Sequence, residues 1–134
     1  MQHEVTIICD DIRAETGHKY SLMGLYDEAI VVESVPGRIA KLCMYQRWAE
    51  VTKFPSSFRV EIKGSALGGK IFNVEPLPAD VKDYDPARTK AQLMVVVAPL
   101  DLITAGEIQF LTYVEHKTQP TYSHKLEVRI GKVT

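Results

Sequence analysis

The chain has 134 residues, of which 46% are hydrophobic and 25% are charged, as is typical of a soluble globular protein. Its sixteen basic and seventeen acidic residues nearly balance, which argues against general binding to nucleic acid, since that requires a basic surface. The longest apolar run, residues 93–100, is far shorter than the roughly 20 residues of a membrane-spanning helix. We therefore expect one domain, residues 1–134, with no membrane segment.

The expected elements are all strands, because apolar and polar residues alternate with period two and no segment keeps a helical period. In residues 58–63, Phe58, Val60 and Ile62 alternate with charged residues, which predicts a strand with one buried face. In chain order the predicted strands cover residues 4–9, 19–26, 29–34, 38–48, 58–63, 70–75, 91–98, 107–116 and 125–130.

Three of these strands carry more specific expectations. In residues 4–9 the alternation predicts that Val5, Ile7 and Cys9 point into the core. In residues 125–130 it predicts the same for the apolar residues, which are Leu126, Val128 and Ile130. Residues 38–48 are apolar on both faces, which indicates either a central strand that is covered twice or an outer face used for contacts.

Turn signals separate the predicted strands every 8 to 15 residues. Pro36 and Gly37 indicate a turn in which the glycine is free to take a positive φ angle, and residues 76–89, with three prolines, form the longest predicted loop. About nine short strands with this spacing predict an all-β fold, a single antiparallel β-sandwich of the immunoglobulin-like or C2-like kind. A closed β-barrel with a ligand cavity is the alternative.

Residues 9–15, with the sequence CDDIRAE, form the densest group of functional side chains. A nucleophilic Cys9 would need a histidine as its base, and nothing in the sequence places any of the four near it. Asp10 and Asp11 are a poor acid–base pair, because adjacent strand residues face opposite sides. We expect Cys9 to be a core residue and the aspartates to bond the backbone of a turn. Arg13 is expected to pair with an acid.

The exposed members of this segment are candidates for a binding surface, namely Asp11, Arg13, Glu15 and Lys19. A second candidate surface is the outer face of strand 38–48, around Tyr45, Arg47 and Trp48. Here the alternative is that Trp48 caps the edge of the core.

Metal binding is a further alternative. Calcium needs six to eight oxygen ligands, and acidic residues from several loops of a sandwich can supply them. Asp83 and Asp85 in the longest predicted loop are the most suggestive pair. The histidines and cysteines show no spacing typical of a zinc site.

Residues 9–27 also resemble a family of small uncharacterised bacterial and phage proteins. Members carry the pattern C-D-D-[IV]-R-x-E, then a glycine-bearing turn, a lysine, and S-L-[IM]-G-[LV]-[YF]-D. The positions that match are Cys9, Asp10, Asp11, Ile12, Arg13, Glu15, Gly17, Lys19, Ser21, Leu22, Gly24, Tyr26 and Asp27, while His18 replaces a second glycine. The resemblance implies a bacterial or phage origin and carries no established activity.

Two cysteines without C-x-x-C spacing, and a first segment without the features of a secretory signal, lead us to expect a cytoplasmic protein with free thiols. We expect a non-enzymatic binding or assembly module without a cofactor, which binds a protein partner or forms a homo-oligomer. A small-molecule- or calcium-binding sandwich is the alternative.

Overall fold

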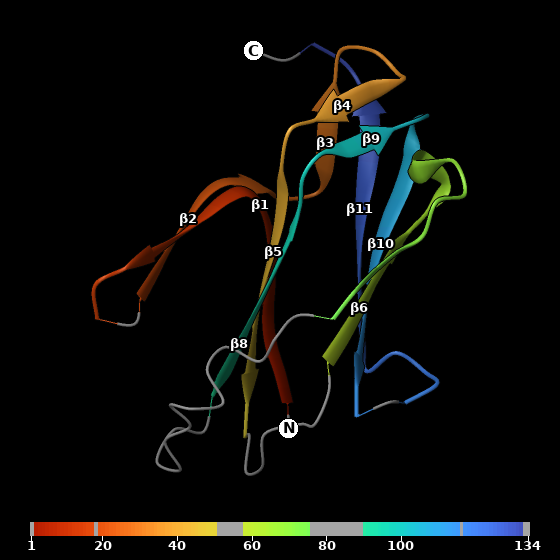
Figure 1. The fold of residues 1–134 in the computed structure, drawn as a ribbon. Helices are drawn as coiled ribbons and strands as arrows, with labels where there is room; N and C mark the ends of the chain where they lie inside the picture. The colour runs from red at the N-terminus through yellow and green to blue at the C-terminus, as the bar shows by residue number, and fades with distance from the viewer. Residues whose placement is uncertain (1, 18, 51–57, 76–89, 116, 133–134) are drawn as a thin grey trace.

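The computed structural model describes residues 2–17, 19–50, 58–75, 90–115 and 117–132 (Figure 1). This part of the chain contains eleven strands and one turn of 3₁₀ helix, Ser65–Leu67. The strands are β1 (Gln2–Glu15), β2 (Lys19–Tyr26), β3 (Ala29–Val32), β4 (Gly37–Ile39), β5 (Leu42–Ala49), β6 (Phe58–Lys63), β7 (Phe72–Val74), β8 (Ala91–Val97), β9 (Leu100–Leu102), β10 (Gly106–Val114) and β11 (Tyr122–Ile130).

Two open sheets pack face to face. One has the order β2-β1-β5-β8, and the other has the order β3-β11-β10-β6-β7. All their strand pairs are antiparallel except β3 with β11. Apart from β2 and β3, this is the order A-B-E opposite G-F-C-C′ of an immunoglobulin-like sandwich. The all-β sandwich is therefore confirmed, and the barrel alternative is wrong, because the sheets of the described residues do not close on themselves.

The core lies between the two sheets and joins residues of both. Strand β6 shows the predicted alternation, since Phe58, Val60 and Ile62 are 4%, 0% and 1% exposed while the residues between them are only half-buried. A polar bridge crosses the core, where the amide Nε2 of Gln46 on β5 donates a 2.9 Å hydrogen bond to Thr112 Oγ1 on β10. Both side chains are fully buried, and each is satisfied by the other.

The long strand predicted over residues 38–48 is in fact two strands. The strand is interrupted at Ala40 and Lys41, so that β4 lies outside the two large sheets and pairs with β9. The sequence did not predict β9. Arg38 Nε donates to Asp101 Oδ1 at 2.7 Å across this small ribbon, which closes one end of the sandwich (Figure 1). The chain bends at residues 33–36, where a turn was predicted, and Gly37 then begins β4 without using the positive φ angle that a glycine allows.

The predicted faces of the first strand are wrong. The register of β1 against β5 shifts between His3 and Val5, which indicates a β-bulge, and a shift of one residue reverses the face of every residue after it. As a result Ile8 lies in the core opposite Met44, and Cys9 lies on the outer face opposite Cys43.

In the last strand, Leu126 and Val128 are buried as predicted. Ile130 is 55% exposed, contrary to the prediction. It lies at the end of β11, beyond the residues of that strand that reach the core cluster.

Candidate functional site

Residues 10–17 and 19–26 form a hairpin that projects from the sandwich, and we call this hairpin the arm. Strand β1 is 14 residues long, but β5 pairs with it only as far as Cys9. Beyond that point β2 is the only strand paired with β1, in a register that joins Glu15 to Lys19 at the tip. Figure 1 shows the arm leaving the side of the four-stranded sheet that faces away from the other sheet. The first strand was predicted to end at residue 9, with Asp10 and Asp11 in a turn, but both aspartates lie within β1.

The arm bends where Asp10 lies against Gly24. Gly24 has φ +67°, a backbone conformation that favours glycine, and a Cβ atom at this position would lie 2.2 Å from Asp10 Oδ2. The Tyr26 hydroxyl donates a hydrogen bond to Asp10 Oδ1. Burial, together with this carboxylate, raises the pKa of Tyr26 above its usual range. Three positions of the family-like pattern thus build one bend.

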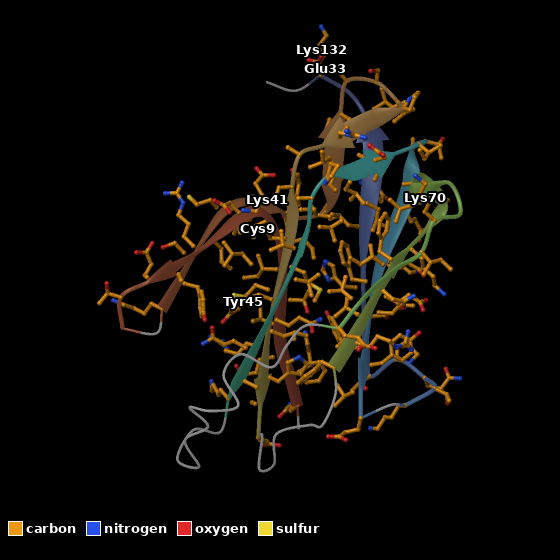
Figure 2. The ribbon with its side chains drawn as sticks, viewed as in Figure 1. Cys9, Glu33, Lys41, Tyr45, Lys70 and Lys132 are labelled. Carbon is orange, nitrogen blue, oxygen red and sulfur yellow. The ribbon has the colours of Figure 1, made fainter. Side chains whose placement is uncertain are left out.

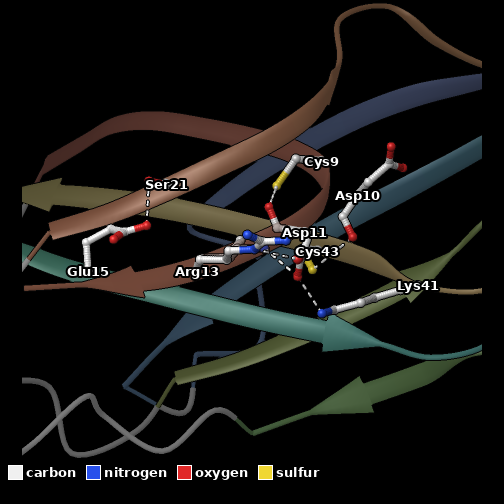
Figure 3. A network of polar contacts seen from close by, with 9 residues as sticks. Cys9, Asp10, Asp11, Arg13, Glu15, Ser21, Lys41 and Cys43 are labelled. Carbon is white, nitrogen blue, oxygen red and sulfur yellow. Dashed lines mark hydrogen bonds and ion pairs between the residues drawn. The ribbon is translucent and has the colours of Figure 1, made fainter.

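Asp11 is the centre of a second group of polar contacts at the bend (Figure 3). It forms an ion pair with Lys41, which lies just before β5, and Arg13 Nε approaches its other oxygen at 3.5 Å. The backbone N–H of Ile12 donates to Asp11 Oδ1 at 3.0 Å. The hydrogen bond from Lys41 lowers the pKa of Asp11 and raises that of Lys41. The predicted partnership of Arg13 with an acid is confirmed, and Lys41 was not predicted.

Cys9 and Cys43 lie side by side beneath the bend, with 0% and 1% of their surfaces exposed (Figure 3). Both thiols are free, and each donates to a backbone carbonyl of the bend, Cys9 to Asp11 at 3.5 Å and Cys43 to Asp10 at 3.7 Å. Burial raises the pKa of Cys9 to about 11. Cys9 is buried as predicted, but on the outer face of its sheet. A thiolate is the nucleophilic form of cysteine, and the raised pKa disfavours it.

The tip of the arm carries the remaining residues of the first predicted surface. The Ser21 hydroxyl donates to Glu15 Oε1 at 3.0 Å across the two strands (Figure 3). Glu15 and Lys19 are both exposed, as the sequence predicted. Asp11 is partly buried by its ion pairs, so the four residues do not form one uniform surface.

The second predicted surface is divided between the two faces of β5. Tyr45 and Arg47 point outward, and burial raises the pKa of Tyr45, against the opposing effect of Arg47. Trp48 points into the core and is 1% exposed, so its assignment to a contact surface is wrong and the alternative placement at the core is confirmed. Its Nε1 donates to Gln46 Oε1 at 3.3 Å, and the ring of His3 lies edge-on at 5.3 Å.

A cleft of about 490 Å³ lies between the arm and the outer face of the four-stranded sheet. Figure 2 shows Tyr45 below the point where Cys9 and Lys41 mark the base of the arm. The residues that line the cleft come from β1, β2, β5 and β8 and are Val5, Ile7, Lys19, Tyr20, Leu22, Tyr45, Arg47 and Gln92. The sequence singled out Lys19, Tyr45 and Arg47 but placed them on two separate surfaces.

The aspartates proposed as calcium ligands, Asp83 and Asp85, lie outside the described residues. Within the described ranges, no group of three or more His, Cys, Asp or Glu side chains is arranged to hold a metal ion. There, Asp11 and Asp101 form ion pairs with basic side chains, and Asp10 accepts a hydrogen bond from Tyr26.

In comparisons with known proteins, the sequence matches no protein-family model, and a search of the curated proteins returns no match. No helix in the described part of the chain has the length and apolar character that crossing a membrane requires.

Proposed function

We propose that the protein is a non-enzymatic assembly module that associates with further copies of itself through the surface at the base of the arm. This surface contains one row of cross-strand neighbours on the outer face of the four-stranded sheet. From β2 to β8 the row is Leu25, Cys9, Cys43 and Val96. The two ends of the row are 60% and 52% exposed, whereas the cysteines between them are buried.

The exposure of Leu25 and Val96 is the observation that carries this proposal. Large apolar side chains at more than half exposure on one face of a sheet favour a contact surface, because covering them removes apolar area from water. A second copy is the simplest partner, since a two-fold axis lets the same surface serve both molecules. The arm adds a strand, β2, whose outer edge has no partner strand among the described residues.

The test measures molar mass by light scattering at micromolar concentrations. We expect a defined oligomer for the native chain and a shift towards the monomer in Leu25→Glu and Val96→Glu, because each places a charge in the contact. Ile71→Glu is the matched control, since Ile71 is 56% exposed but precedes β7 in the other sheet. A native chain that stays monomeric, or an equal effect of Ile71→Glu, contradicts the proposal.

The non-enzymatic part of the proposal is supported by the state of the thiols. With a pKa raised from 9.0 to about 11, Cys9 carries about 100-fold less thiolate at neutral pH than an unperturbed thiol. An alkylating reagent should therefore label Cys9 and Cys43 only after unfolding. Rapid labelling of the folded chain at neutral pH would contradict this part of the proposal.

A cytoplasmic location and a bacterial or phage origin belong to the same proposal. The location is supported by two free thiols that lie opposite each other on paired strands, as expected in a reducing compartment. The origin rests on the pattern in residues 9–27. The small-molecule alternative is supported by a separate feature, the cleft.

A further inference from the structure

We propose that the cleft between the arm and the four-stranded sheet binds a small organic anion that has an apolar body and an amide N–H donor. This goes beyond self-assembly, because the cleft lies against the rows of Tyr45 and Arg47, whereas the proposed contact lies on the row of Cys43. The two sites can therefore be tested separately.

The shape of the cleft fits a small ligand. Its volume of about 490 Å³ falls in the range of roughly 300–1,000 Å³ that small-molecule sites occupy. One wall is the sheet, with Val5, Ile7 and Tyr45, and the other is the arm, with Tyr20 and Leu22. Aliphatic and aromatic side chains thus form most of the lining, which favours a ligand with an apolar or aromatic body.

The charges of the cleft favour an anion. Its lining contains two cations, Lys19 and Arg47, and no carboxylate. Arg47 Nε donates to Glu4 Oε2 at 2.6 Å, but Lys90 also binds Glu4 at 3.0 Å, so two cations share one carboxylate. Lys19 forms no ion pair with the described residues. A ligand carboxylate between β2 and β5 would balance this excess of positive charge.

Gln92 is the reason that we expect the ligand to carry a hydrogen-bond donor. The residue is half-buried, but its Oε1 is shielded from water and has no hydrogen-bond partner, which is uncommon for a shielded amide oxygen. Gln92 lies on β8 opposite Arg47 and lines the cleft. The last torsion of a glutamine side chain has a broad energy profile, so rotation of the amide can turn this oxygen towards the cleft to accept a hydrogen bond from a ligand N–H. The cleft thus combines an apolar lining, an anion site and an unused acceptor.

Three probes of nearly the same size separate these requirements. N-acetylphenylalanine has the apolar ring, the carboxylate and the N–H. N-acetylphenylalaninamide lacks the carboxylate, and 2-acetoxy-3-phenylpropionate, the ester in which an oxygen replaces the N–H, lacks the donor. Binding is measured by titration calorimetry and by ligand-observed NMR, with each probe up to millimolar concentration. We expect the first probe to bind about tenfold or more tightly than either of the others.

Two variants with matched controls locate the binding. Lys19→Met should weaken the preference for the carboxylate, since Arg47 remains in the lining, and Gln92→Leu should remove the preference for the N–H. Lys125→Met and Gln109→Leu make the same changes on β11 and β10 of the other sheet and should leave all three affinities unchanged. A thermal melt of each variant confirms that it is folded.

The proposal is overturned if none of the probes binds at millimolar concentration or if all three bind equally. It is also overturned if a control variant reduces binding as much as its partner variant does. The titration is repeated with Leu25→Glu, the variant that separates the assembly. Unchanged affinity in that variant supports a cleft that acts independently, even where the native chain is a monomer and the assembly proposal fails.

Discussion

Strands β5 and β6 lie in opposite sheets and bury their residues in different ways. In β6, buried and half-buried residues alternate, because only one face of the strand is covered. In β5, the five residues Leu42–Gln46 are all buried. The difference arises outside the strand, since the bend of β1 covers Cys43 and the arm borders Tyr45. Burial on the outer face of a sheet therefore depends on what packs against that face. Substitutions in β5 can test how closely the arm and the bend of β1 pack against its outer face.

The largest expected effect comes from truncating an aromatic residue on each face of β5. Trp48→Ala should lower the free energy of unfolding by about 3–5 kcal/mol, because it leaves a cavity between the sheets. Tyr45→Ala should cost about 1–2 kcal/mol, because its ring borders an open cleft. Urea unfolding at one fixed protein concentration measures both. Equal losses would mean that the outer layer is packed as closely as the core.

The bend of the arm should be the next most sensitive point. Gly24→Ala should destabilise the chain by about 3 kcal/mol, because the methyl group strains a positive φ angle and displaces Asp10 from Tyr26. Gly69→Ala is the control, since Gly69 also has a positive φ angle but a Cβ there meets nothing within 4 Å. We expect about 1–2 kcal/mol for that control. If the two variants lose the same free energy in chemical denaturation, the clash with Asp10 is unimportant.

Disrupting the polar bridge between the sheets should lower the free energy of unfolding by a smaller amount, and a second substitution should restore part of it. Gln46→Leu should cost about 1–3 kcal/mol, because it leaves Thr112 Oγ1 and Trp48 Nε1 buried without their partner. Adding Thr112→Val should recover part of this loss, since it removes one of the unpaired groups. A double mutant that is less stable than Gln46→Leu alone would show that the bridge is not what couples the two positions.

The smallest expected effect is a dependence of stability on pH. Burial, helped by the nearby His124, lowers the pKa of His3 below 6.5, and burial lowers that of His124 in the same way. The unfolded chain therefore binds more protons than the folded chain, so stability should fall as the pH drops below about 6.5. His3→Phe should reduce this fall, since a phenyl ring can keep the 3.5 Å stacking on Tyr122. Urea midpoints at several pH values measure it, and an identical slope in the variant would exclude His3 as the cause.

Local patterns were sufficient to predict the fold class. The alternation of Phe58, Val60 and Ile62 required only that one face of the strand meet a core, and it was correct. In β1 the same reasoning failed, because the β-bulge after His3 leaves no mark in the pattern of apolar and polar residues. A sequence pattern shows that the residues of a strand alternate between two faces, but a single extra residue at a β-bulge decides which of the two faces meets the core.

The candidate site was predicted in pieces. The predicted surface grouped Tyr45, Arg47 and Trp48, although the alternation of a strand places Tyr45 and Arg47 on one face and Trp48 on the other, as the structure does. The cleft itself was not predictable, because it exists only through the bend at Gly24, which brings Lys19 to the sheet. No local pattern relates Gln92 to the arm, since the two meet only after β8 has paired with β5.

The parallel pairing of β3 with β11 has a consequence for how the chain folds as it is made. Residues 29–32 leave the ribosome well before their partner, residues 127–130, which lies 98 residues further along the chain. At a synthesis rate of roughly 5–20 residues per second, β3 waits on the order of ten seconds for that partner. During this time Ile30, which is 2% exposed in the finished fold, remains open to solvent and to neighbouring nascent chains. We therefore expect the unfinished polypeptide to depend on chaperones more than the completed one does.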